Sequence, residues 1–105
     1  MTSDRELLEK AAKAAGYEHR TDPYHPGRVF IRHAGHEWQY FDPLNDDGDA
    51  LRLAVKLRIT LTMFKTFVRA EVDEMPDVME DDQPGPYAAT RRAIVRAAAA
   101  IGEPK

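Results

Sequence analysis

Apolar and polar residues alternate on both sides of Lys65-Thr66, and this pattern constrains the fold more than any other feature of the chain. Alternation with a period of two predicts strands, and a short break between two such runs predicts an antiparallel hairpin. A turn centred on these two residues places apolar pairs on one face: Met63 with Val68, Leu61 with Ala70, and Ile59 with Val72. It places polar pairs on the other face: Thr62 with Arg69, Thr60 with Glu71, and Arg58 with Asp73. The agreement of both faces supports this register.

The stretch Arg28 to Phe41 predicts a second hairpin around Ala34-Gly35. A two-residue loop there pairs His33 with His36, Arg32 with Glu37, Ile31 with Trp38, and Val29 with Tyr40. The apolar pairs then share one face, and Arg32 with Glu37 forms an ion pair on the other. We therefore expect Trp38 to be largely buried.

Three helices are predicted over residues 3–16, 46–57 and 86–101. Ser3 and Glu6 fit a capping box, acidic residues crowd the start of the second helix, and Pro86 suits the first position of the third. Apolar residues at helical spacing predict the buried stripe of the second helix: Ala50, Leu51, Leu53, Ala54 and Leu57. Residues 17–27, with two prolines and a glycine, are expected to form an irregular loop.

These elements predict one α+β domain over residues 1–105, with the order α-ββ-α-ββ-α. We expect the two hairpins to form one four-stranded antiparallel sheet with helices packed on it, as an αβα sandwich. The chain has no cysteine, so the core must hold without disulfides.

Three runs of sequence resemble the phage ABA sandwich domain family. They cover residues 7–17 (LLEKAAKAAGY), 42–57 (DPLNDDGDALRLAVKL) and 86–99 (PYAATRRAIVRAAA). The resemblance implies a phage or prophage origin and a β-sheet sandwiched by helices. The resemblance implies no catalytic residues. The histidine-rich middle of the chain departs from the family's pattern.

The residues themselves predict a protein that is not an enzyme and needs no cofactor. Cysteine is absent, and Ser3 is the only serine. The position of Ser3 at the start of a helix is explained by a capping role. No glycine-rich phosphate-binding motif occurs.

Histidine is the one residue type that raises the question of a metal site. The candidates are His25, His33 and His36, with His19 or Asp22 as further ligands. Their spacing matches no standard zinc motif, so we expect no metal.

The acidic segment of residues 77–85 is the predicted docking surface. Its candidate partner-binding residues are Asp77, Val78, Met79, Glu80, Asp81 and Asp82. We expect this segment to be mobile and to attract a basic partner, with its apolar residues adding contact. Asp46, Asp47 and Asp49 form a second acidic cluster. Its glycine spacing does not fit a calcium loop, so we expect these residues to stabilise the start of the helix, with partner binding as a secondary role.

We therefore expect a cytoplasmic protein of the bacterial host that acts by binding. The expected partner is a host protein, such as a nucleic-acid-binding CRISPR or restriction component. The alternatives are a histidine-based metal-binding module or small metalloenzyme, and an accessory protein that assembles as a homodimer. The net charge of −3 argues against direct binding to nucleic acid, and no run of about 18 apolar residues predicts a membrane span.

Overall fold

The computed structural model describes residues 3–33, 35–83 and 85–103. Along these ranges the chain forms three helices and six strands. In chain order they are α1 (Asp4–Ala14), β1 (Glu18–Asp22), β2 (His25–Arg32), β3 (Gln39–Phe41), α2 (Asp47–Leu57), β4 (Thr60–Met63), β5 (Phe67–Glu71), β6 (Val78–Asp81) and α3 (Pro86–Ile101).

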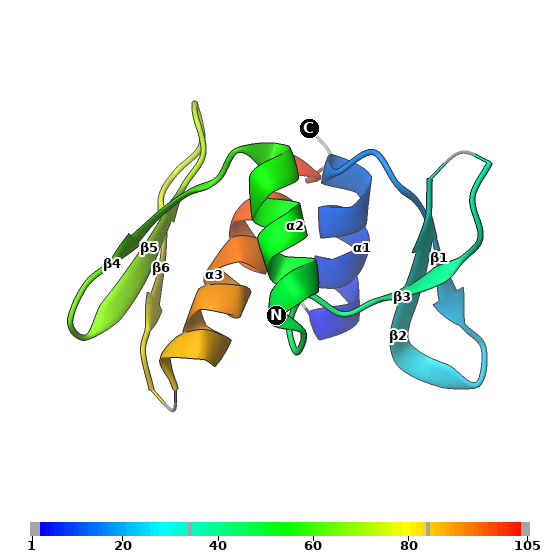
Figure 1. The fold of residues 1–105 in the computed structure, drawn as a ribbon, viewed down its shortest axis with the longest axis horizontal. Coiled ribbons are helices and arrows are strands. Elements are labelled where there is room, and N and C mark those ends of the chain that lie inside the picture. The colour runs from blue at the N-terminus through cyan, green and yellow to red at the C-terminus, as the bar shows by residue number, and fades with distance from the viewer. Residues whose placement is uncertain (1–2, 34, 84, 104–105) are drawn as a thin grey trace.

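The strands form two separate antiparallel sheets, β1-β2-β3 and β4-β5-β6, each with three strands. The helices lie between the two sheets, so the layers run sheet, helices, sheet (Figure 1). The α+β class and the alternation of helices with hairpins are confirmed. The single four-stranded sheet with helices outside it, an αβα sandwich, is wrong, because each hairpin gains a third strand and keeps to its own side.

All three helices begin and end within two residues of their predicted bounds, because local signals set them. The Ser3 side chain accepts a hydrogen bond from the backbone N–H of Glu6, and the Asp46 side chain does the same for Asp49. Gly16 follows α1 with φ +79°, a conformation that glycine adopts without strain.

The hairpin of β4 and β5 has the predicted register. Leu61 pairs with Ala70, Thr62 with Arg69, and Met63 with Val68. The acidic segment that follows is not one irregular loop, because Val78–Asp81 form β6 and pair with β5. Pro84, within the predicted segment, lies outside the described residues.

The first hairpin differs from the prediction by one residue. Ile31 pairs with Gln39 and Val29 with Phe41, where the prediction paired them with Trp38 and Tyr40. A slip of one residue turns each side chain to the opposite face, so Phe41 is buried and Trp38 is only half-buried. Ala34, one of the two predicted turn residues, lies outside the described residues.

Strand β1 lies where an irregular loop was expected. Its residues are all polar, and all but Asp22 are exposed. Backbone pairing with β2 holds this strand, and no apolar alternation marks it in the sequence. Arg32 pairs with Glu18 of β1 and not with Glu37 as predicted.

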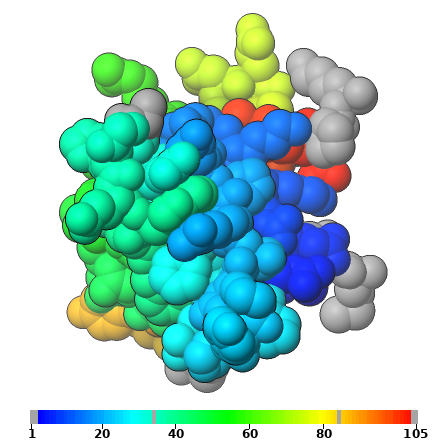
Figure 2. Space-filling model, turned by 90° about the vertical axis from the view of Figure 1, so that its right-hand side faces the viewer, coloured from blue at the N-terminus to red at the C-terminus, as the bar shows by residue number. Residues whose placement is uncertain are grey.

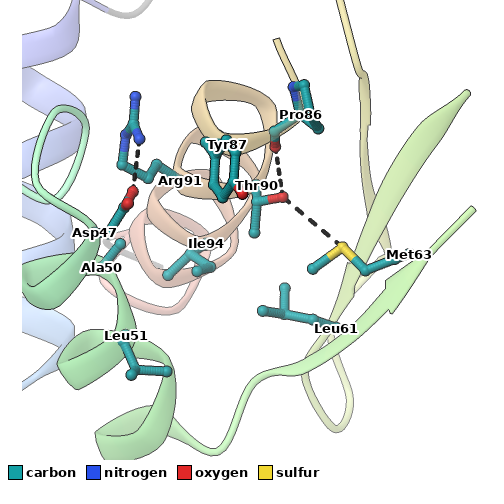
Figure 3. A pocket seen from close by; sticks show the side chains of 10 residues that line it. All are labelled: Asp47, Ala50, Leu51, Leu61, Met63, Pro86, Tyr87, Thr90, Arg91 and Ile94. Carbon is teal, nitrogen blue, oxygen red and sulfur yellow. Dashed lines mark hydrogen bonds and ion pairs between the residues drawn. The ribbon is translucent and has the colours of Figure 1, made fainter.

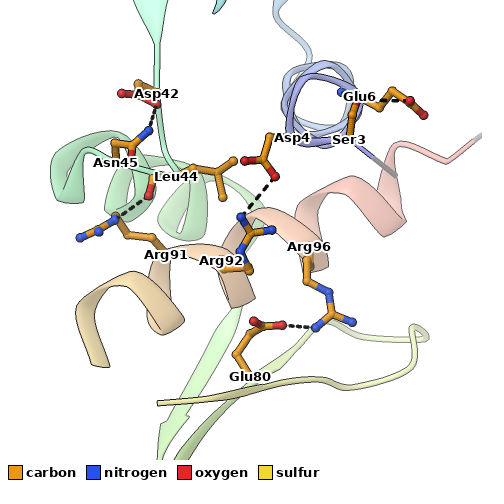
Figure 4. A network of polar contacts seen from close by, with 10 residues as sticks. All are labelled: Ser3, Asp4, Glu6, Asp42, Leu44, Asn45, Glu80, Arg91, Arg92 and Arg96. Carbon is orange, nitrogen blue, oxygen red and sulfur yellow. Dashed lines mark hydrogen bonds and ion pairs between the residues drawn. The ribbon is translucent and has the colours of Figure 1, made fainter. Parts of the chain in front are cut away.

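Helix α3 is the centre of the molecule. One part of its surface packs with α1, α2 and the first sheet through Ile94, Val95 and Ala98. Another part packs against β5 through Ala89, Ala93 and Ala97. Its arginines reach outward from the same helix: Arg92 to Asp4 of α1, and Arg96 to Glu80 of β6 (Figure 4). Among the described residues, no helix has the length and apolar character that crossing a membrane requires.

Candidate functional site

An apolar groove lies between α2 and β4, with α3 as its floor (Figure 3). Its volume is about 530 Å³. The residues that line it are Asp47, Ala50 and Leu51 from α2, Leu61 and Met63 from β4, and Pro86, Tyr87, Thr90, Arg91 and Ile94 from α3. This size falls within the range of ligand-binding clefts.

Large apolar side chains are exposed at the rim of the groove. Leu51 is 62% exposed, Met63 61% and Tyr87 74%. Isolated exposed apolar residues are ordinary, but three that line one groove make it a candidate contact surface. The prediction that Leu51 belongs to the buried stripe of α2 is wrong, because the buried residues of this helix are Ala50, Leu53 and Ala54.

The polar groups in the groove are bonded to one another. Arg91 donates to the backbone oxygen of Leu44 at 2.8 Å and to Asp47 Oδ1 at 2.6 Å. Thr90 Oγ1 donates to the backbone oxygen of Pro86 at 2.7 Å and lies 3.8 Å from the Met63 sulfur. These contacts hold the end of the groove in place and leave its apolar surface as the part that can bind.

The free edge of β4 borders the groove. In the described part of the chain β4 pairs only with β5, so its other edge presents backbone N–H and C=O groups without strand partners. Leu61 and Met63 pair with the buried residues Ala70 and Val68, so these side chains share the face that covers α3. A strand added at this edge would lie over the groove.

Exposed basic residues stand at both ends of β4. Arg58 caps α2 in a left-handed conformation, with φ 54°, and precedes the strand by two residues. Lys65 follows the strand in the turn to β5. Both side chains are exposed, so the edge is apolar along the groove and positively charged at its ends.

The predicted acidic docking segment lies at the opposite edge of the same sheet. Val78 packs against the core beside α3, and Glu80 is bound to Arg96, which also donates to the backbone oxygen of Met79. Asp81 accepts a hydrogen bond from the backbone of Gln83, and the backbone N–H of Asp82 donates to Thr66. Much of this acidic segment is therefore engaged in contacts within the protein.

The acidic cluster before α2 is also tied into the fold. Asp46 caps the helix, Asp47 binds Arg91, and Asp49 binds Arg52 and the backbone N–H of Asp42. Each carboxylate has a partner within the chain, which accounts for the cluster without a second protein.

The histidines are divided between the two ends of the first sheet. His25 lies beside Asp22, with 3.0 Å between Nδ1 and Oδ2, at the turn between β1 and β2. Hydrogen bonds from the backbone N–H of Tyr24 and from His25 lower the pKa of Asp22. His33 and His36 lie beyond the far end of β2, with ring centres 6.0 Å apart. Eight residues of extended chain separate His25 from His33 by about 26 Å, and no group of three potential ligands occurs among the described residues.

The groove was missed at the sequence level, although α2 carried a signal for it. Leu51, which lines the groove, lies outside the buried residues Ala50, Leu53 and Ala54 of this helix, so it is an apolar residue that the buried stripe does not require. No family model, curated protein or solved structure matches this chain. Its resemblance to the phage ABA sandwich domain family stays a sequence-based expectation.

Proposed function

We propose that this protein is a binding factor without catalytic machinery, which captures an extended segment of another protein at the edge of β4. One observation carries the proposal: an unpaired strand edge borders an apolar groove whose rim exposes Leu51, Met63 and Tyr87. Strand edges and apolar grooves are each used for peptide recognition, and here they adjoin.

Strand addition would use both features at once. The backbone of the incoming segment would hydrogen-bond to β4, which supplies affinity that does not depend on sequence. Its alternate side chains would point the same way as Leu61 and Met63 and enter the groove over Thr90 and Ile94. These side chains would supply the specificity.

The charges at the ends of β4 select the occupant. Arg58 and Lys65 favour a segment whose apolar core is flanked by acidic residues. A second copy of this chain fits less well, because antiparallel pairing of two β4 edges brings the Arg58 end of one copy to the Lys65 end of the other. A different protein is therefore the occupant that we propose. In the phage setting that the family resemblance implies, it would be a host component, such as part of a defence system.

A short fluorescent peptide tests this proposal. The probe alternates valine and threonine over five residues, carries two aspartates at each end, and is followed by fluorescence anisotropy. Leu51→Ser and Met63→Ser should each weaken binding about tenfold, since each removes roughly 1.4 kcal/mol or more of apolar contact. Val55→Ser is the matched control: Val55 lies one turn along α2, is 68% exposed and does not line the groove. It should bind as the parent does.

Three results would contradict the proposal. One is equal loss of affinity in Leu51→Ser and Val55→Ser. Another is equal binding of a peptide in which lysine replaces each aspartate. The third is a dimer in sedimentation that Met63→Ser abolishes, because the occupant would then be a second copy of this chain.

A further inference from the structure

The outer face of the β1-β2-β3 sheet carries arginine and aromatic side chains packed on one another. Arg20 and Arg32 lie over the Trp38 ring, with 4.4 and 4.7 Å from guanidinium carbon to ring centre. Arg28 lies 5.5 Å from the centre of the Tyr40 ring, and the rings of Phe30 and Tyr40 are 6.0 Å apart. These contacts join all three strands.

The strand register explains why these residues gather on one side. Phe30 pairs with Arg20 on β1 and with Tyr40 on β3, and residues that pair directly share a face. The buried residues Val29, Ile31 and Phe41 occupy the other face, against the helices. Trp38 is placed with the outer group by its contacts with Arg20 and Arg32.

This face is open to solvent and rich in arginine. In Figure 2 the light-blue to turquoise residues of this sheet face the viewer. Arg20, Arg28 and Tyr40 are exposed, the last at 47%. Of the two acidic residues of β1, Glu18 is paired with Arg32 and Asp22 lies beside His25. The chain as a whole has a net charge of −3, yet these arginines gather on one face of the folded protein.

We propose that this face binds single-stranded nucleic acid, independently of the groove beside β4. For bases to stack on Trp38 and Tyr40, the guanidinium groups of Arg20 and Arg28 would leave the rings that they now cover and would pair with phosphates. Aromatic rings on an open sheet with arginines beside them are the combination that single strands require. Trp38 directly precedes β3 and lies two residues from Tyr40, which corresponds to about 7 Å of extended chain and suits neighbouring unstacked bases.

The width of this three-stranded face favours a single strand over a duplex. The major groove of B-DNA admits a helix or a two-stranded ribbon, and this sheet has three strands. An acidic protein would use the arginines alone and would gain little from the exposed ring of Tyr40. The rings therefore distinguish the proposed ligand from other polyanions.

The test uses the intrinsic fluorescence of Trp38, the only tryptophan in the chain. The probe is a twelve-nucleotide oligothymidylate, titrated into the full chain at low salt. We expect saturable quenching. The logarithm of the binding constant should fall against the logarithm of the salt concentration with a slope of about −1.4, for two phosphate contacts at roughly −0.7 each.

Two substitutions on the face should weaken binding of the oligonucleotide while Trp38 remains as the reporter. Arg28→Glu should lower affinity at least tenfold, and Tyr40→Ala about tenfold, through loss of a phosphate contact and of a stacking surface. Lys65→Glu makes the same change of charge on the other sheet and should stay within about twofold of the parent. Both target side chains are exposed, and thermal melting monitored by circular dichroism checks that each variant is folded.

Several outcomes would overturn the proposal. Absence of saturable quenching at low salt would do so. So would equal loss in Lys65→Glu and Arg28→Glu, which would show a general charge effect. Equal affinity for polyglutamate would assign the face to an acidic protein, and equal affinity for a duplex would remove the role of the rings.

Discussion

Single residues hold this fold together where its elements come closest. Gly102 follows α3 at its approach to α1, and a Cβ atom added there would lie 2.0 Å from the backbone oxygen of Lys10. Backbone atoms cannot move aside as the end of a flexible side chain can, so the helices would have to separate.

Gly102→Ala should therefore lower the free energy of unfolding by about 1–3 kcal/mol. Urea denaturation measures the change. Gly27→Ala is the matched control, because a Cβ atom at that position meets nothing within 4 Å and the glycine has no positive φ. Equal stability of Gly102→Ala and the parent would contradict the close approach of α1 and α3.

At the scale of elements, the register of the first hairpin decides which aromatic residues belong to the core. Phe41 is 3% exposed and Tyr40 is 47% exposed, whereas the predicted register placed Tyr40 on the apolar face with Val29. Phe41→Ala should cost about 3–5 kcal/mol of unfolding free energy, as expected for a buried aromatic residue. Tyr40→Ala should cost much less. Chemical denaturation of both variants distinguishes the registers, and a larger loss from Tyr40→Ala would support the two-residue turn.

The sequence predicts an element well where one face of it is buried and the other is not. Strand β5 meets this condition, with Val68 and Ala70 buried between less buried neighbours, and the β4-β5 hairpin has its predicted register. In the first hairpin, Trp38, Tyr40 and Phe41 are all aromatic, so either register offers an apolar face, and hydrophobic pattern cannot choose between them. Strand β1 is entirely polar, and β6 has two apolar residues followed by two acidic ones, so neither strand has an apolar alternation to detect.

At the scale of the whole molecule, the arrangement of layers follows from α3. This helix is buried on two sides, against two different groups of core residues, so it has to lie between the sheets (Figure 1). Its alanine-rich sequence is consistent with that place, because small side chains let neighbouring elements approach closely. The pattern within a hairpin does not indicate whether two hairpins join in one sheet. The prediction of a single sheet therefore had no support from the strands themselves.

Each of the two proposed surfaces combines residues that only the fold brings together. The groove combines residues from α2, β4 and α3, which are up to 47 positions apart between Asp47 and Ile94. The outer face of the first sheet depends on the register that sequence pattern could not choose. The acidic residues that stood out in the sequence lie mostly in ion pairs, hydrogen bonds and a helix cap.

Amide hydrogen exchange with and without the valine–threonine peptide tests the central claim, capture of a partner strand at β4, most directly. The backbone amides of residues 60–63 that point away from β5 should exchange at least tenfold more slowly when the peptide is bound, because they gain hydrogen-bond partners. The amides of β6, at the other edge of the same sheet, should not change. Protection at β6 or in the first sheet, with none at β4, would contradict the account.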